Sequence, residues 1–122
     1  MTERKENIVD LSYDFAVRVV KLCKIVSTER KERVLSKQLL RSGTSIGANV
    51  KESQNAESGA DFVHKLSIAL KEAGETEYWL RLLRDGEFLS GKEYDSINND
   101  LMSVIKMLTS IINTKKMKMR KE

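Results

Sequence analysis

Apolar residues recur along the chain with the period of an α-helix in four separate stretches. In the first stretch the mean interval between apolar positions is about 3.6 residues, which places them on one face of a helix. These positions are Ile8, Leu11, Phe15, Val19, Leu22 and Val26. Polar residues occupy positions 28–32 before the apolar pattern begins again. The sequence therefore predicts a first helix over about 7–28, followed by a turn.

The second stretch keeps the helical period across two glycines. Its apolar face contains Leu35, Leu39, Ser42, Ile46 and Val50. Gly43 and Gly47 would each weaken an isolated helix by about 1 kcal/mol relative to alanine. Either the helix breaks near Gly43, or it continues and the small residues let another helix approach closely. Because the apolar pattern stays in phase on both sides, we expect one continuous helix over about 33–56.

The third and fourth stretches have equally regular spacing. The third forms a heptad pattern from Phe62, Leu66, Ala69, Ala73, Thr76, Leu80 and Leu83. Ser58, Gly59 and Asp61 supply a break and an N-cap before it. The fourth contains Tyr94, Ile97, Leu101, Val104, Leu108 and Ile111. These patterns predict helices over about 61–85 and 92–116, the last followed by a basic C-terminal tail.

Four amphipathic helices with short connections predict one all-α domain over residues 1–122, an antiparallel up-down-up-down four-helix bundle. The composition agrees, because the 122 residues include no proline and only 6% aromatic residues. No apolar run is long enough to cross a membrane. The first residues are charged where a secretory leader would be apolar. We therefore expect a cytoplasmic protein with no membrane role.

The chain offers few residues for catalysis or metal binding. A carboxylate-bridged metal site in a helix bundle normally uses two Glu-x-x-His motifs, whereas His64 is the single histidine. Cys23 is the single cysteine and has apolar neighbours, as expected for a core residue. No nucleophile elbow and no glycine loop followed by Lys-Ser or Lys-Thr is present. The sequence predicts no enzymatic activity, no cofactor and no metal.

Positive charge is concentrated in two parts of the chain, whose net charge is +4. From residue 101 to residue 121 there are six basic residues and no acidic one. The candidate nucleic-acid-binding residues are Arg30, Lys31, Arg33 and Lys37 around the first turn, and Lys115, Lys116, Lys118 and Arg120 in the tail. They form either a positive surface for phosphates or a solvated helix end whose cations complement the helix dipole.

A polar stripe runs beside the apolar face of the second predicted helix. If the second and third helices are antiparallel, Arg41 or Asn49 of the second helix comes close to Glu72 and Glu75 of the third. The interpretation that we favour is an internal hydrogen-bonded network, because buried charges must be paired. A ligand or metal pocket is the alternative. The predicted network consists of Arg41, Ser45, Asn49, Glu52, Glu72 and Glu75.

Two motifs in this region carry a family resemblance. The first is QLLRSGTSIGANVKE at residues 38–52, and the second is FVHKLSIALKEAGETEYWL at residues 62–80. They resemble the bacterial four-helix-bundle family that contains the proteins encoded in intervening sequences of 23S ribosomal RNA genes. The same fold is similar to that of the accessory variability protein of diversity-generating retroelements. That protein is a basic homopentamer that binds nucleic acid and its reverse transcriptase, so the resemblance implies nucleic-acid binding.

We expect a non-enzymatic, oligomeric module that binds RNA, DNA or a ribonucleoprotein. The alternative is a protein-interaction scaffold with no nucleic-acid role. Self-association is expected because several apolar residues lie off the main helix faces and a monomer would expose some of them. These residues are Val20, Ile25, Val63, Leu70, Leu82, Met102, Ile105 and Ile112. The resemblance alone implies a pentamer.

Overall fold

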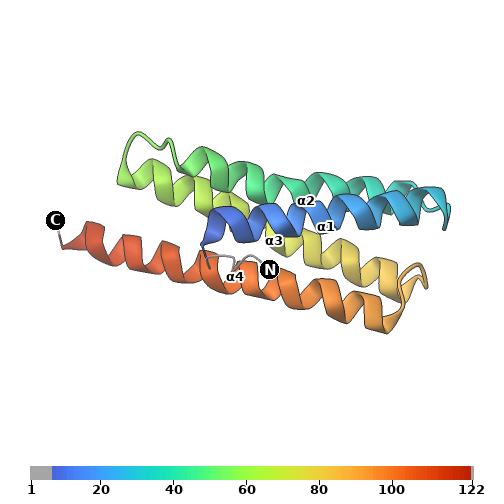
Figure 1. Cartoon of the computed structure of the whole chain (residues 1–122). Helices are drawn as coiled ribbons and strands as arrows, with labels where there is room; N and C mark the ends of the chain where they lie inside the picture. The colour runs from blue at the N-terminus through green and yellow to red at the C-terminus, as the bar shows by residue number, and fades with distance from the viewer. Residues whose placement is uncertain (1–6, 122) are drawn as a thin grey trace, which may run out of the picture.

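The computed structural model describes residues 7–121, which form four helices and no strand (Figure 1). The helices are α1 (Ile8–Thr28), α2 (Val34–Ser53), α3 (Gly59–Asp85) and α4 (Gly91–Arg120). α1 and α3 each pack against both α2 and α4. The α1–α2 and α3–α4 connections lie at one end, and the α2–α3 connection and the C-terminus lie at the other. The all-α four-helix prediction is confirmed, and this arrangement is compatible with up-down-up-down topology.

Local capping chemistry sets where the helices begin. Asn7 Oδ1 accepts a hydrogen bond from the Asp10 amide at 2.8 Å and caps α1. Ser58 Oγ accepts one from the Asp61 amide at 3.0 Å. Ser58 is therefore the N-cap, and α3 begins at Gly59 rather than at Asp61. α2 ends at Ser53, earlier than the predicted position 56, because residues 54–58 form the turn that leads to this cap.

The last helix is longer than predicted. α4 continues to Arg120, so the basic tail expected after residue 116 is helical. Basic side chains near a helix C-terminus interact favourably with its dipole. Met119 and Lys115 also lie close over Gly59, because a Cβ atom placed there would be 3.2 Å from Met119 Sδ and 3.3 Å from Lys115 Cε. Both effects favour continued helix in this segment.

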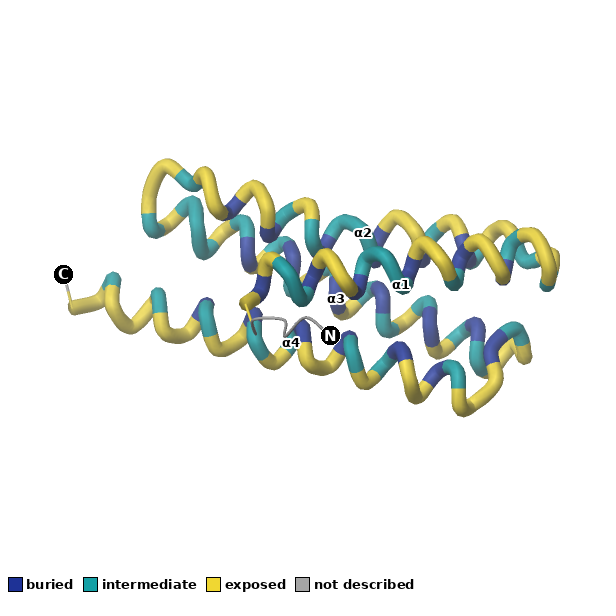
Figure 2. Tube along the Cα trace, viewed as in Figure 1, coloured by how far each residue is buried: buried dark blue, intermediate teal, exposed yellow. Residues whose placement is uncertain are grey.

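The core follows the predicted apolar faces, with a small rotation in α1. Figure 2 shows buried positions along the inner side of every helix and mostly exposed positions in the last turns of α4. In α1 the fully inward positions include Ser12 and Cys23, whereas Leu11 and Leu22 are half-buried at the edge of the core. Phe15 and Val19 occupy the centre of this face, and Ser12 lies opposite Gly47 of α2.

Two glycines place α2 against α1. A Cβ atom at Gly43 would lie 2.8 Å from Cγ1 of the fully buried Val19. At Gly47 it would lie 3.4 Å from the carbonyl oxygen of Ser12. α2 remains one continuous helix through both positions, as predicted. The glycines therefore serve close packing between helices rather than a break in the chain.

The same substitution at two helical glycines is expected to have opposite effects. Gly43→Ala should lower the free energy of unfolding, because overpacking against the stiff, buried Val19 costs about 1–3 kcal/mol and helix propensity returns only about 1 kcal/mol. Gly74→Ala should raise it by about 1 kcal/mol, because no atom lies within 4 Å of a Cβ atom there. Urea unfolding measures both. A Gly43→Ala protein as stable as Gly74→Ala would contradict the close approach.

Candidate functional site

Three of the predicted basic residues are exposed at the end of the bundle that holds the α1–α2 turn (Figure 1). These residues, Lys31, Arg33 and Lys37, make no ion pair with any residue that the structure describes. Lys31 has a φ of 60°, in the left-handed region, where the chain reverses direction. All three side chains are therefore available to an anion in solution.

Arg30, the fourth residue of this cluster, has a structural role instead. Its two terminal nitrogens donate to the Glu93 carboxylate at 2.9 and 2.7 Å, and one of them also donates to the Phe88 carbonyl oxygen at 2.7 Å. Glu93 in turn accepts from the Ser90 amide at 2.8 Å in the capping box of α4. These contacts use the guanidinium of Arg30 to join the α1–α2 turn to α4, whereas nucleic-acid binding by Arg30 stays a prediction.

The C-terminal cluster lies at the opposite end of the bundle, beside the α2–α3 connection (Figure 1). Lys116, Lys118 and Arg120 are exposed on the last turns of α4, and Lys115 is half-buried against the start of α3. The expectation that both basic clusters build one surface is wrong for a single chain. Antiparallel helices place the first turn and the C-terminus at different ends.

A further basic residue joins the first cluster and was missed from the sequence. Lys24 of α1 lies across a groove from Arg33 and Lys37 of α2. This cationic groove, defined by these three residues, has a volume of about 360 Å³ and no acidic residue among those that line it. A helix wheel of α1 places Lys24 on its polar face, but only the α1–α2 packing brings it beside the other two.

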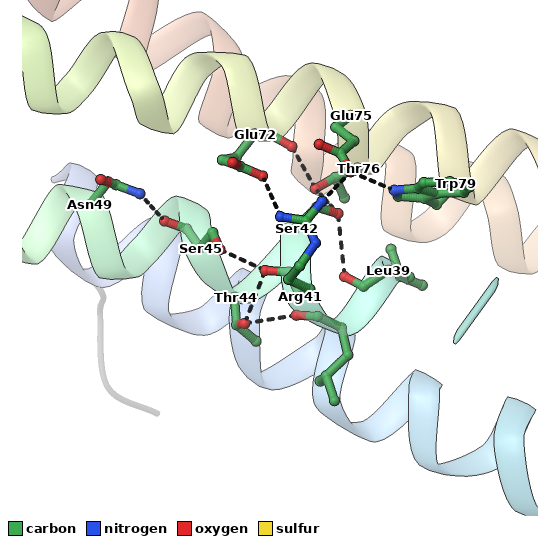
Figure 3. Close-up of polar contacts among 11 residues, drawn as sticks. Leu39, Arg41, Ser42, Thr44, Ser45, Asn49, Glu72, Glu75, Thr76 and Trp79 are labelled. Carbon is green, nitrogen blue, oxygen red and sulfur yellow. Dashed lines mark hydrogen bonds and ion pairs between the residues drawn. The ribbon is translucent and has the colours of Figure 1, made fainter. Parts of the chain in front are cut away.

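The predicted Arg41 network exists at the surface and not in the interior (Figure 3). Arg41 donates to Glu72 at 3.5 Å and to Glu75, and Trp79 Nε1 donates to Glu75 at 3.1 Å. The hydrogen bond from Trp79 is the largest cause that lowers the pKa of Glu75, and the hydrogen bond from Arg41 is the second. The side chain of Arg41 is 49% exposed, so solvent screens these pairs and they add little stability. The long Arg41 side chain reaches from α2 to solvent at the edge of α3.

The remaining members of the predicted network contact other groups. Ser45 Oγ donates to the Arg41 carbonyl oxygen at 2.7 Å, and Asn49 Nδ2 donates to the Ser45 carbonyl oxygen at 2.9 Å. Glu52 is exposed and lies 3.3 Å from Lys65 Nζ. Because two of these residues bond to their own helix and the third pairs at the surface, they do not form an enclosed ligand pocket.

The buried polar contact between α2 and α3 involves two other residues. Thr76 Oγ1 lies 3.0 Å from Ser42 Oγ and 2.8 Å from the Glu72 carbonyl oxygen, and both side chains are fully buried. Figure 3 shows this contact close to the Arg41 pairs. The sequence pattern placed both residues on apolar faces, which is correct for their burial. It gave no signal that their hydroxyls meet.

The described part of the chain contains no arrangement suited to metal binding. Among residues 7–121, no three His, Cys, Asp or Glu side chains come together as metal ligands. His64 is exposed on α3. In the same part of the chain, no helix has the length and apolar character needed to cross a membrane.

Arg30→Gln is expected to weaken the fold in a pH-dependent way. Hydrogen bonds lower the pKa of Glu93 from 4.5 to about 2, and the largest contribution comes from Arg30, followed by the Ser90 amide. This stabilisation is complete above 4.5 and disappears as the pH falls towards about 2. The variant should lose about 1 kcal/mol at neutral pH, and the loss should shrink in that acid range.

Urea unfolding at several pH values measures this effect. Lys92→Gln is the matched control, because Lys92 is exposed at the same end of the bundle and makes no ion pair with a described residue. A loss that is the same for both variants, or that does not vary with pH, would contradict the role assigned to Arg30.

Two comparisons with known proteins agree with the sequence motifs and the fold. The model of the family "23S rRNA-intervening sequence protein" matches residues 4–110. A protein with unknown function from the S23 ribosomal protein family of Bacteroides thetaiotaomicron VPI-5482 is 57% identical, and its crystal structure superposes with a TM-score of 0.86. The alignment covers 87% of this chain and 98% of that chain. No curated protein matches. The chain belongs to the 23S rRNA-intervening sequence protein family.

Proposed function

We propose that the chain is a non-enzymatic, oligomeric accessory module that binds nucleic acid through phosphate contacts. The observation that carries this proposal is that six exposed basic residues make no ion pair within the described part of the chain. They are Lys31, Arg33 and Lys37 at one end and Lys116, Lys118 and Arg120 at the other. The family name refers to sequences within 23S rRNA, which makes RNA the first ligand to test.

Two acidic residues near the first turn, Glu32 and Glu93, are already engaged. Glu32 Oε1 accepts from the amides of Leu35 and Ser36 at 2.7 and 3.0 Å and caps α2. Glu93 is held by Arg30, as described above. Unpaired cations attract phosphates, and binding releases the counterions of the nucleic acid. Glu32 and Glu93 therefore do not pair with Lys31, Arg33 or Lys37.

Contacts to phosphates rather than to bases fit the aromatic residues of the chain. Of its aromatic side chains, Tyr13 and Tyr78 are exposed, and neither lines the cationic groove. Base stacking in single-stranded nucleic acid needs aromatic platforms beside the basic residues. The proposed binding is therefore largely independent of sequence and strongly dependent on salt.

Fluorescence anisotropy with labelled RNA and duplex DNA tests the proposed function. We expect micromolar binding at about 50 mM salt and a steep loss of affinity towards about 200 mM salt, because phosphate contacts dominate. Pretreatment of the protein with nuclease removes copurified nucleic acid. Absence of binding to both probes at the lower salt concentration would contradict the proposal.

Exposed apolar residues support the oligomeric part of the proposal. Of the residues expected off the helix faces, Val20, Ile25 and Met102 are 49%, 37% and 41% exposed. Ile112 is instead buried in the core and no longer supports an interface. The others are half-buried, namely Val63, Leu70, Leu82 and Ile105. A closed ring would cover the exposed apolar residues and bring several basic clusters together.

Light scattering at micromolar concentration measures the assembly. We expect a mass several times the 13.9 kDa of one chain, and the pentamer implied by the resemblance would have five times that mass. A dimer or trimer would keep the interface and exclude the pentamer. A mass of 13.9 kDa would contradict oligomerisation.

A protein-interaction scaffold is the second candidate function. A groove of about 680 Å³ between α1 and α2 is lined in part by Val9, Tyr13, Ala16 and Ala48. Val9 is 39% and Tyr13 is 66% exposed, so this apolar groove favours a polypeptide ligand over a phosphate. A defined protein that copurifies after nuclease treatment, together with the absence of RNA and DNA binding, would favour this function.

A further inference from the structure

The cationic groove places like charges together without a compensating group. Lys24 approaches from α1, while Arg33 and Lys37 approach from α2. The ion pairs of the described residues include none of these three cations. Like charges around one concave surface repel one another and raise the local positive potential. An anion bound in the groove would relieve this repulsion.

Two of these cations also lie at the unfavourable end of their helix. Arg33 is the N-cap of α2 and makes no capping hydrogen bond, and Lys37 follows the first turn. The N-terminus of a helix carries partial positive charge, so basic residues there are destabilising. Arg33 and Lys37 are also four positions apart, a spacing at which like charges repel. The stability of α2 therefore does not explain why Arg33 and Lys37 are basic.

The C-terminal cluster differs in this respect. Lys118 and Arg120 lie in the last turn of α4, where cations complement the helix dipole. Their positions are explained by the stability of α4. Residues that are unfavourable for the local structure concentrate at functional sites. Arg33 and Lys37 are unfavourable at the start of α2, whereas Lys118 and Arg120 are favourable at the end of α4.

The other groups in the cationic groove are neutral. Cys23 Sγ donates to the Ser36 carbonyl oxygen at 3.3 Å, and burial raises the pKa of Cys23 to about 12, so the thiol stays protonated at neutral pH. The hydroxyls of Ser27 and Ser36 donate to backbone oxygens at 3.4 and 2.7 Å. The partly exposed Val20 and Leu40 also line the groove. No negative side chain competes with a phosphate there.

We propose that the cationic groove is the phosphate-binding site of the chain and takes adjacent phosphates of a nucleic-acid backbone. The proposal rests on the proposed function and assigns it to Lys24, Arg33 and Lys37. All three residues line the groove, and Lys24 lies on a different helix from the other two. The C-terminal cluster is not required for this contact.

Two triple variants with the same change of charge test the assignment. The groove variant is Lys24→Gln, Arg33→Gln and Lys37→Gln, and the tail variant is Lys115→Gln, Lys116→Gln and Lys118→Gln. We expect the groove variant to lose at least about tenfold in RNA affinity at low salt and to reduce the salt slope by about two to three, one for each lost phosphate contact. The tail variant should keep the wild-type slope. Equal losses in both variants, or a loss in the tail variant alone, would overturn the assignment and leave the proposed function intact.

Thermal unfolding separates a phosphate site from general electrostatic attraction. Without ligand, the melting temperature of the groove variant should rise by about 4 °C, because unfavourable cations leave the start of α2. Inorganic tripolyphosphate should raise the melting temperature of the wild type and of the tail variant, but not that of the groove variant. An equal rise in all three proteins would overturn the groove as an anion site.

The two probes also distinguish the two proposals. Stabilisation of the wild type by tripolyphosphate without binding of RNA or DNA would overturn the proposed function and the assignment to a nucleic-acid backbone. The groove would then be a site for small phosphate compounds. Light scattering on each variant confirms that the assembly is unchanged, so that a lost interface cannot be mistaken for a lost site.

Discussion

The short connections between antiparallel helices determine which residues of this chain share an end of the bundle. They place the α1–α2 and α3–α4 turns together and the C-terminus at the other end (Figure 1). Arg30 can therefore hold Glu93, although 63 positions separate them in the sequence. The same constraint separates Lys37 from Lys118. The chain is left with two distinct positive regions. Lys24, Arg33 and Lys37 line a groove of about 360 Å³ in the first, and Lys115 and Lys118 line one of about 260 Å³ in the second.

Three of the ion pairs between helices or turns use arginines, and Lys65 with Glu52 makes a fourth. In the described part of the chain, Lys31, Lys37, Lys116 and Lys118 at the two ends make no ion pair. Arg18 joins Asp100 across α1 and α4, and Arg30 and Arg41 make the corresponding links at the first turn and between α2 and α3. The planar guanidinium group suits such pairing with two acceptors. These arginines occupy Asp100, Glu93, Glu72 and Glu75, so these four carboxylates do not pair with the lysines at the two ends.

The interface between α2 and α3 shows how side-chain length decides which polar contact is buried. Ser42 and Thr76 are short, and their hydroxyls meet at 3.0 Å within the core without displacing apolar neighbours. Arg41 is long, so it extends past the interface and pairs with Glu72 and Glu75 where water reaches the group. The buried contact orients the two helices, and the outer one adds an ion pair at their edge.

The sequence by itself determined the four helices, most of the core and the family, because helical periodicity, capping residues and the two motifs are local properties. Periodicity also kept α2 continuous through Gly43. Only the tertiary structure decided that Arg30 pairs with Glu93, that the Arg41 side chain is half exposed and that Lys24 lies across the groove from Arg33. The physical reason is that periodicity gives the direction of a side chain around its own helix. How deeply a side chain is buried depends on how closely the neighbouring helix packs. Which residue it pairs with depends on which residues of that helix lie at the same level along the bundle axis.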